Sequence, residues 1–357
     1  MPERQVILVT GGAGYVGAAV VRALRRAGHR PVVVDDLTSG HRTAVGETPL
    51  LRARCGESRR LAAFLRRHRV RAAVHTAASC LVGESVQQPA RYYRNNLVEG
   101  LSLLDTLREC RVRRFIFCST AAVYGEPKSI PIPEDHPQEP VNPYGETKAA
   151  FERVLRWYCS AYGMSAVALR FFNAAGAEVN GEHGEDHSPE THLIPRLLAH
   201  AAGGAPAVQL FGTDYPTPDG TAVRDFVHVD DLAAAHLLAL ERCAAPGRFE
   251  AYNLGTGTGT SVREVLRAAE RVTGRILKVD ERARRAGDPA FLVASNARAR
   301  EILGWRPLHA LEQILASAWR WHEAHPDGYG SRRGSGRRRA RVVPSRNAVI
   351  KSRRGSS

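Results

Sequence analysis

The chain of 357 residues is 43% hydrophobic and carries a formal net charge of +15. This length is enough for one large core or two fused lobes, and no apolar run approaches the roughly 18–20 residues of a membrane span, so no membrane partner is expected. Residues 331–357 contain nine arginines, one lysine and no acid, which gives a charge of +10 and leaves only about +5 (15 − 10) for the rest of the chain. No nucleic-acid-binding motif accompanies this basic segment, so no specific nucleic-acid partner is expected.

The first half of the chain alternates between predicted strands and predicted helices. Apolar runs that end in glycine or polar residues predict buried strands, and apolar residues three or four positions apart predict helices. The strands are expected at 5–10, 30–35, 72–76, 115–118 and 166–171, and the helices at 14–27, 59–68, 92–110 and 144–162. This alternation predicts an α/β fold with a Rossmann-like, doubly wound parallel sheet.

The pattern loosens after residue 172. Residues 181–189 are polar, and 215–220 contain two prolines and a glycine, so both segments are expected to be loops. Further helices are predicted at 193–202, 231–243, 262–273 and 297–303. We interpret residues 1–172, with a return of the chain around 226–258, as the first domain. Residues 173–330 are then mainly a smaller mixed α/β lobe that receives the substrate, and 331–357 form a disordered basic tail.

A glycine-rich loop, residues 11–17 (GGAGYVG), follows the first strand and opens the first helix. Gly11, Gly14 and Gly17 permit a tight turn and a close approach of a pyrophosphate to the helix N-terminus, whose free amides and dipole favour an anion. Asp35 closes the second strand, where an acidic residue is expected to hold a ribose diol. A carboxylate would repel a 2′-phosphate, so the cofactor is predicted to be NAD rather than NADP.

Two hydroxyl-bearing motifs indicate hydride chemistry. Ser119 and Thr120 end a predicted strand, at the edge where open α/β sheets bind ligands. Tyr144 and Lys148 lie four residues apart on a predicted helix, so both side chains can point into one cleft. A nearby ammonium is expected to lower the pKa of the tyrosine, which could then take a proton from a sugar hydroxyl.

The remaining polar signals are structural. Asn142 and Pro143 are typical of a helix start just before Tyr144. The histidines His75, His192 and His228, together with His236, have no metal-ligand spacing, so no metal is predicted, and His75 is interpreted as a hydrogen-bonded, partly buried side chain. The six cysteines include no Cys-x-x-Cys pair, and the first residues lack the features of a secretory leader, so a cytoplasmic location is expected.

Together these residues resemble the extended short-chain dehydrogenase/reductase family and, within it, the UDP-sugar 4-epimerases. The resemblance covers about residues 5–307. The long segment 214–229 is much more diagnostic than the glycine loop. The resemblance rests on residues 10–17 (TGGAGYVG), 82–85 (VGES), 92–96 (YYRNN), 119–125 (STAAVYG), 169–173 (LRFFN), 214–229 (DYPTPDGTAVRDFVHV) and 252–257 (YNLGTG).

The resemblance implies three sets of site residues and a homodimer. The catalytic set is Thr120, Tyr144 and Lys148. The NAD-binding set is Gly11, Gly14, Tyr15, Val16, Gly17, Asp35, Asp36, Glu57, Ala77, Asn96, Lys148 and Phe172. The set that binds a UDP-sugar is Thr120, Tyr144, Asn173, Leu193, Phe211, Arg224, Arg285 and Asp288. The two arginines supply cations for a diphosphate.

Three positions depart from the family pattern. Glu57 stands where many members have an aspartate near the adenine, and it has a longer reach. Cys80 stands where some members have a lysine near the cofactor pyrophosphate, which would weaken NAD retention. Leu292 replaces a bulkier aromatic beside the sugar, and the smaller side chain would leave room for an N-acetyl group.

The implied activity is the interconversion of UDP-glucose and UDP-galactose through a 4-keto intermediate, with NAD taking and returning the hydride at C4. C4 epimerases of UDP-N-acetylhexosamines or UDP-pentoses, and a decarboxylase, remain open on the same scaffold. A 4,6-dehydratase is disfavoured because Ala121 and Ala122 cannot transfer protons. A non-catalytic NAD-binding regulator is disfavoured by the intact catalytic set.

Overall fold

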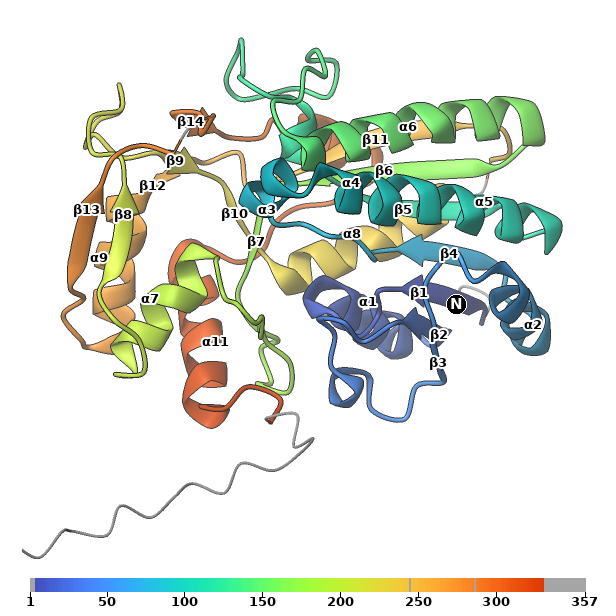
Figure 1. The fold of residues 1–357 in the computed structure, drawn as a ribbon, viewed down its shortest axis with the longest axis horizontal. Coiled ribbons are helices and arrows are strands. Elements are labelled where there is room, and N and C mark those ends of the chain that lie inside the picture. The colour runs from blue at the N-terminus through green and yellow to red at the C-terminus, as the bar shows by residue number, and fades with distance from the viewer. Residues whose placement is uncertain (1–3, 244, 286, 331–357) are drawn as a thin grey trace, which may run out of the picture.

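The computed structural model describes residues 4–243, 245–285 and 287–330, arranged in a large lobe and a smaller one (Figure 1). The predicted disordered tail, residues 331–357, lies outside the described residues. None of the described helices is long and apolar enough to span a membrane.

The large lobe is built on a seven-stranded sheet in which every neighbouring pair is parallel. The strand order is β11-β6-β5-β4-β1-β2-β3, and in the middle of the sheet Val9 pairs with Val33 on one side and Val74 on the other. This order confirms the predicted doubly wound α/β class. The strands are β1 (Val6–Thr10), β2 (Arg30–Asp35), β3 (Leu50–Arg52), β4 (Ala72–His75), β5 (Arg114–Thr120), β6 (Ser165–Phe171) and β11 (Phe249–Leu254).

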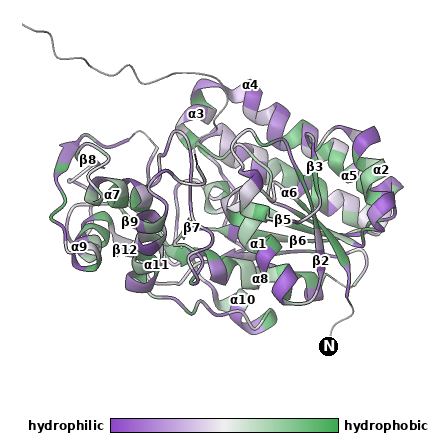
Figure 2. Cartoon of the chain, turned by 90° about the horizontal axis from the view of Figure 1, so that it is seen from below, coloured by the Kyte–Doolittle hydropathy of each residue, from purple (hydrophilic) through white to green (hydrophobic). Residues whose placement is uncertain are grey.

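Helices cover both faces of this sheet because successive strand residues point to opposite sides. Ile7 and Val9 pack against α1 (Tyr15–Arg26) and α8 (Val229–Arg242), whereas Leu8 packs against α2 (Ser58–His68), α5 (Glu99–Glu109) and α6 (Pro143–Tyr162). In Figure 2 the strands of this sheet are mainly hydrophobic, and the outer sides of the helices are hydrophilic.

Short helical segments complete the large lobe. The helix predicted at 92–110 begins earlier than expected, at Pro89, and widens into a π-helical stretch before α5. The segments are η1 (Arg42–Val45), α3 (Val82–Gln87), α4 (Pro89–Tyr92), the π-helix η2 (Tyr93–Val98), η3 (Ala121–Val123) and α10 (Ala297–Ile302).

The smaller lobe combines three helices with short strands. Its core is formed mainly by α7 (Leu193–Ala201), α9 (Val262–Thr273) and α11 (Leu311–Ala324). The helix predictions for α7 and α9 are confirmed, whereas α11 and the short strands were missed. These strands are β7 (Asn173–Ala175), β8 (Val208–Phe211), β9 (Val223–Arg224), β10 (Phe226–His228), β12 (Thr260–Ser261), β13 (Val279–Arg282) and β14 (Phe291–Leu292).

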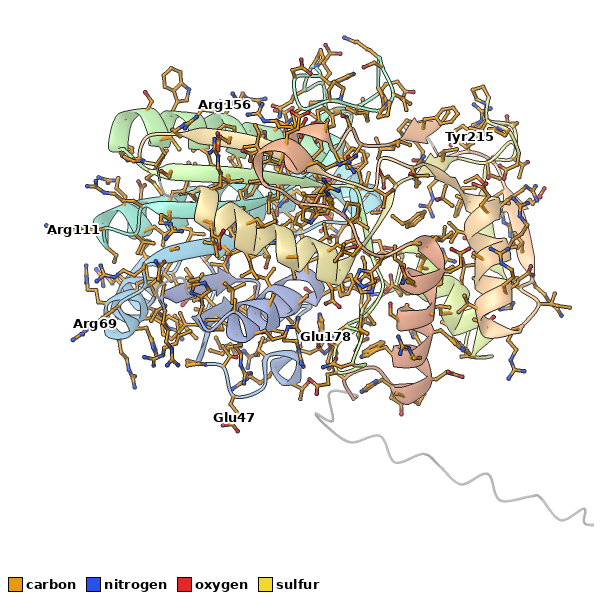
Figure 3. The ribbon with its side chains drawn as sticks, turned by 180° about the vertical axis from the view of Figure 1, so that it is seen from behind. Glu47, Arg69, Arg111, Arg156, Glu178 and Tyr215 are labelled. Atoms are coloured by element: carbon orange, nitrogen blue, oxygen red, sulfur yellow. The ribbon has the colours of Figure 1, made fainter. Side chains whose placement is uncertain are left out.

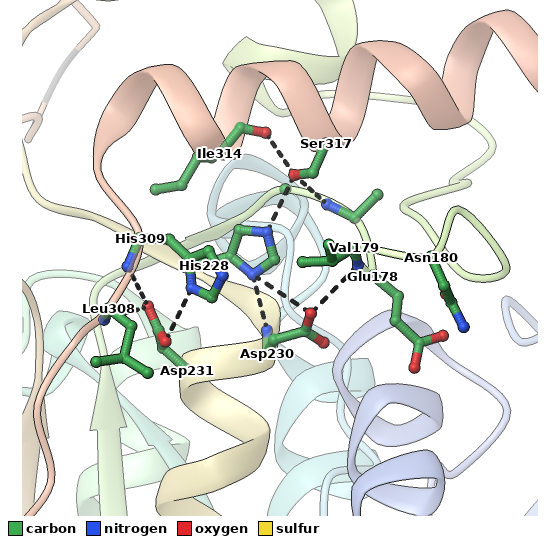
Figure 4. A network of polar contacts seen from close by, with 12 residues as sticks. Glu178, Val179, Asn180, His228, Asp230, Asp231, Leu308, His309, Ile314 and Ser317 are labelled. Carbon is green, nitrogen blue, oxygen red and sulfur yellow. Dashed lines mark hydrogen bonds and ion pairs between the residues drawn. The ribbon is translucent and has the colours of Figure 1, made fainter.

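Polar networks join the two lobes. His228 caps α8 by accepting from the Asp230 amide at 3.1 Å, and its Nε2 lies 3.0 Å from Ser317 Oγ on α11 (Figure 4). Glu178, labelled in Figure 3, pairs with Arg22 and Arg26 of α1. The second lobe is therefore fixed against the helices that flank the sheet.

Candidate active site

The site is built at the edge of the sheet where the parallel strands have their carboxyl ends. Thr10, Asp35, His75 and Thr120 are the last residues of β1, β2, β4 and β5. Loops that leave this edge carry most of the predicted cofactor and catalytic residues, as expected for an open α/β sheet.

The glycine loop is closed so tightly that side chains cannot replace two of its glycines. Gly11 has φ +68°, and a Cβ there would lie 2.5 Å from the Ala77 nitrogen. A Cβ on Gly17 would lie 2.1 Å from the Gly11 carbonyl oxygen. The structure thus brings Gly11, Gly17 and Ala77 of the predicted cofactor set into direct contact.

The N-terminus of α1 fits an anionic ligand. Among the described residues no side chain caps it and its first turn holds no acid, so its amides are available to a phosphate group. Asp35 holds the loop in place, since its Oδ2 accepts from the Ala13 amide at 2.9 Å and its Oδ1 from the Leu37 amide at 2.8 Å. Burial raises the pKa of Asp35, and the two amides oppose that shift. These residues fit the pyrophosphate and ribose of a dinucleotide.

Other residues of the predicted cofactor set stabilise the loops around this position. Asn96 is buried; its Oδ1 accepts from the Ser79 amide at 2.8 Å, and its Nδ2 donates to the Ser79 carbonyl at 3.0 Å. Tyr15 donates its hydroxyl to the Gly176 carbonyl at 2.6 Å. Glu57 accepts from the Arg54 amide at 2.8 Å and pairs with Arg60.

Three further members of that set lie nearby in the fold. Val16 packs against the core beneath α1, and Phe172 belongs to the apolar cluster around Ala121. Asp36 accepts from the Thr38 amide at 2.9 Å.

The start of α6 places Tyr144 beside Thr120. Asn142 caps the helix through a 2.9 Å bond from the Gly145 amide, with Pro143 at the first position, which confirms the predicted helix start. A Cβ on Gly145 would lie 2.4 Å from the Ala122 carbonyl oxygen, so the first turn of α6 rests on the turn after β5. Thr120 lies close enough to Tyr144 that its hydroxyl lowers the pKa of the phenol.

Lys148 is buried one turn further along α6, and its Nζ donates to the Cys118 carbonyl at 2.7 Å. Burial lowers the pKa of Lys148 to about 8. The predicted lowering of the Tyr144 pKa is wrong for this structure. Burial raises the pKa of Tyr144 and Cys80 raises it further, whereas Thr120 lowers it only in part. The Lys148 ammonium therefore donates to a backbone carbonyl of β5 and not to the Tyr144 phenol.

The histidine at the end of β4 is confirmed as a hydrogen-bonded buried side chain. His75 Nδ1 lies 2.7 Å from Thr10 Oγ1, and burial lowers the pKa of His75 to about 3. His236 is buried too, with Nδ1 2.7 Å from the Leu232 carbonyl oxygen.

Four of the six predicted substrate residues of the smaller lobe come together at a second, cationic position: Phe211, Arg224, Arg285 and Asp288. Arg224 pairs with Asp288, and the Arg285 guanidinium lies 3.9 Å from the centre of the Phe211 ring. Asn173 Oδ1 is buried and has no hydrogen-bond partner among the described residues, which leaves it available to a ligand. Leu193 begins α7.

Two groups near these positions were missed by the sequence analysis. Arg196, one turn into α7, acts electrostatically on Arg285 and so adds a third cation. Its helical spacing from Leu193 could have indicated it. Glu152 of α6 accepts from Ser119 Oγ at 2.6 Å and pairs with Arg170 at 2.7 Å, both fully buried. Nothing in local sequence marks that pair.

Comparisons with known proteins agree with this geometry. The pattern of the NAD dependent epimerase/dehydratase family matches residues 7–255. A UDP-glucose 4-epimerase of Halalkalibacterium halodurans is 46% identical over 326 residues, covering 91% of this chain and 98% of the relative. The chain belongs to this epimerase family, as the resemblance predicted.

Two solved structures share the whole fold. UDP-glucose 4-epimerase from Brucella ovis in complex with NAD has a TM-score of 0.85 and 46% identity, covering 88% of this chain and 97% of the other. UDP-glucose 4-epimerase from Bifidobacterium longum in complex with NAD+ and UDP has a TM-score of 0.87 and 34% identity, covering 90% and 99%.

Proposed function

We infer that the protein is an NAD-dependent UDP-glucose 4-epimerase. The observation that carries this inference is the meeting of Thr120, Tyr144 and the anchored Lys148 at the carboxyl end of β5, on the same sheet edge as the glycine loop. An enzyme that oxidises and reduces one carbon needs a proton-transfer group and a dinucleotide at one position, and this edge offers both.

We assign the residues around the first position to NAD. The amides at the start of α1, the glycines that close its loop and the carboxylate of Asp35 support this assignment. Bound NAD would supply the hydride acceptor for C4, and its cationic ring would favour a phenolate nearby. The full set proposed for NAD is Gly11, Gly14, Tyr15, Val16, Gly17, Asp35, Asp36, Glu57, Ala77, Asn96, Lys148 and Phe172.

We assign the proton transfer at the sugar 4-hydroxyl to Tyr144. As a phenolate, Tyr144 would take the proton of the 4-hydroxyl while C4 is oxidised, and the resulting phenol would return it on reduction. Thr120 is proposed to hydrogen bond the same sugar oxygen. The Lys148 ammonium is held on β5 through its hydrogen bond to the Cys118 carbonyl, one helical turn from Tyr144. No second acid or base follows Thr120, because Ala121 and Ala122 come next, and this disfavours elimination of water.

We assign the diphosphate and uridine to the second position. Arg224 and Arg285 supply cations, Asp288 accepts hydroxyl hydrogens, and Asn173 offers an unpaired oxygen. Leu193, at the start of α7, and Phe211, at the end of β8, are proposed to complete this position. Anchoring the nucleotide rather than the sugar leaves the hexose free to turn between hydride transfers.

This assignment gives each lobe its own ligand. Residues 1–172, with the return at 226–258, are proposed to bind NAD, and 173–330 mainly the UDP-sugar. The division predicts that Arg285→Ala weakens UDP binding in calorimetry and leaves the NAD content of the purified protein unchanged. Loss of NAD from that variant would contradict it.

We propose a homodimer that forms through α6. Trp157 is 74% exposed and Tyr162 47% exposed on this helix, an unusual amount of aromatic surface for an isolated chain. Trp157→Glu should therefore give monomers in sedimentation velocity. Ile276→Glu, at a 90% exposed position in the smaller lobe, is the control that should not. Monomeric wild-type protein would contradict the proposal.

A cytoplasmic location is also proposed. All six cysteines are free thiols in the structure, which suits a reducing compartment. Cell fractionation tests this, and recovery of the protein outside the cytoplasm would contradict it.

One observation favours a second substrate class. Leu292 packs against the cluster that contains Ala121 and Phe172, beside the catalytic turn, and it is smaller than an aromatic side chain. UDP-N-acetylglucosamine is therefore the leading alternative substrate.

The test is incubation of purified protein with UDP-galactose, UDP-N-acetylgalactosamine and UDP-arabinose in parallel, without added cofactor, followed by identification of the products. UDP-glucose should form fastest. Faster conversion of the N-acetyl sugar would favour the alternative, and no conversion of any sugar would contradict the proposed function.

A further inference from the structure

Four side chains in one short segment gather at the entrance to α7. Glu185, His187, Glu190 and His192 each direct one donor atom inward, and these atoms all lie within 4.8 Å of one another. Glu185 is buried, and the other three are partly or well exposed, so an ion could reach the group from solvent.

The spacing of the donor atoms matches a four-coordinate metal. With bonds of about 2.0–2.2 Å, neighbouring ligands of a tetrahedral ion lie about 3.4 Å apart. His187 Nδ1 lies 3.2 Å from Glu185 Oε1 and 3.6 Å from Glu190 Oε2, and His192 Nδ1 lies 3.6 Å from Glu190 Oε1. Two contacts are closer than this geometry requires: His187 with Glu185 by a small margin, and His192 with Glu185, which at 2.5 Å must lengthen when an ion binds.

His187 gives a second indication. Its Nδ1 is buried and makes no hydrogen bond to any described residue, although carboxylate oxygens lie on two sides of it. A buried ring nitrogen without a hydrogen bond is uncommon, and a metal ion between the four groups would satisfy it.

We propose that these four residues form a binding site for one divalent ion of the zinc class. Two imidazole nitrogens with two carboxylates suit zinc, cobalt or nickel, whereas magnesium and calcium prefer oxygen ligands alone. The site lies beside the proposed cleft, since Glu185 and Glu190 act electrostatically on Tyr15, and His187 acts on Cys80. His192 also directly precedes Leu193, so a bound ion fixes the first turn of α7.

The experiment uses the untagged holoenzyme, washed with a chelator and dialysed against limiting zinc chloride. Metal content per chain is measured after gel filtration, and a parallel sample is loaded with cobalt for its visible spectrum. We expect one ion per chain, a spectrum of four-coordinate cobalt and a higher melting temperature on zinc addition.

The test variant is His187→Ala combined with Glu190→Gln, and the matched control is His68→Ala combined with Glu109→Gln, on the far side of the large lobe. The test variant should lose more than about 100-fold in zinc affinity, because even indirect ligand partners are worth 10–100-fold. The control should bind like the wild type. Should the double variant unfold, Glu190→Gln alone serves, with the same expectation of weakened binding.

The proposal is overturned if wild-type protein retains no more zinc than the test variant, or if cobalt gives only the spectrum of the hydrated ion. The four side chains are then an ion-pair cluster and nothing more. Neither outcome depends on turnover, so the metal site and the proposed epimerase activity are tested separately.

Discussion

The position of Tyr144 could be predicted from the sequence, whereas its electrostatic environment could not. The helix start at Asn142 and the four-residue spacing to Lys148 are local features, so they can be inferred from the sequence alone. The pKa of Tyr144 depends on burial and on Cys80, which is 64 positions away in the chain (144 − 80). The direction of that shift therefore emerges only from the fold.

Removing the phenolic oxygen tests the role proposed for Tyr144. Tyr144→Phe should lower kcat by about 100-fold or more, the scale of general acid–base catalysis, because no other group is proposed to move that proton. The amount of bound NAD should not change. Tyr162→Phe removes a hydroxyl from the exposed end of the same helix and should turn over normally. Near-normal turnover in Tyr144→Phe would mean that another group is the base.

The residues of the second, cationic position could not be predicted from local sequence patterns. Arg224, Arg285 and Asp288 could be assigned only through the family resemblance, since their segments are irregular in sequence. The ion pair of Arg224 with Asp288 depends on how β9 and β14 pair, and the contact of Arg285 with the Phe211 ring on how β8 and β13 pair, which no local pattern specifies. Arg196 is different, because its helical spacing from Leu193 in α7 was a local signal that could have indicated it.

At the scale of elements, the glycine loop and α1 form one unit. Gly17→Ala would place a methyl group within 2.1 Å of the Gly11 carbonyl oxygen, so the loop must shift. We expect the purified variant to contain at most about a tenth of the wild-type NAD, a loss of roughly 1.4 kcal/mol or more in binding. Gly204→Ala, where the nearest atom is 3.7 Å away, is the control and should retain its NAD. Full NAD content in Gly17→Ala would contradict the assignment of this loop.

The buried pair between α6 and β6 makes stability depend on pH. Burial would raise the pKa of Glu152, but Arg170 and the hydrogen bonds of Ser119 and Gln138 lower it overall. The lowered pKa means that Glu152 stabilises the fold above its unfolded pKa of about 4.3, and that this stability is lost as pH falls through the folded value.

Glu152→Gln should therefore destabilise the protein at neutral pH by about 3–5 kcal/mol, because Arg170 is left buried without a counter-charge. Its urea midpoint should also fall less than that of the wild type on acidification. Glu146→Gln removes an exposed partner of Arg153 from the same helix and should change stability by less than about 1 kcal/mol. If the urea midpoints of Glu152→Gln and the wild type fell by the same amount on acidification, Glu152 would not be a source of the pH dependence.

Most elements of the large lobe could be predicted, and many of the smaller lobe could not. Strands β1, β2 and β4 are continuous apolar runs bounded by turn residues, so their pattern is unambiguous. The short strands of the smaller lobe span two to four residues and exist only through pairing with distant segments. Helix α11 is different, since Leu311, Ile314, Leu315 and Ala318 do have helical spacing, and that pattern was sufficient to predict it.

At the scale of the whole molecule, the two lobes bring the two proposed ligand positions together. The His228–Ser317 contact and the pairs of Glu178 with α1 fix the smaller lobe against the sheet (Figures 3 and 4). In the proposed function, a sugar anchored by its nucleotide in one lobe is presented to the sheet edge of the other. In the proposed reaction, the C4 hydrogen therefore leaves the sugar and returns to it within one enclosed site.

The most direct measurement follows deuterium placed at C4 of UDP-galactose. Purified protein without added cofactor should convert it to UDP-glucose that keeps the label at C4, since hydride taken and returned inside the site does not exchange with water. Loss of the label to solvent, or incorporation of solvent deuterium at C4 from unlabelled substrate, would contradict hydride transfer at this carbon and with it the proposed epimerase mechanism.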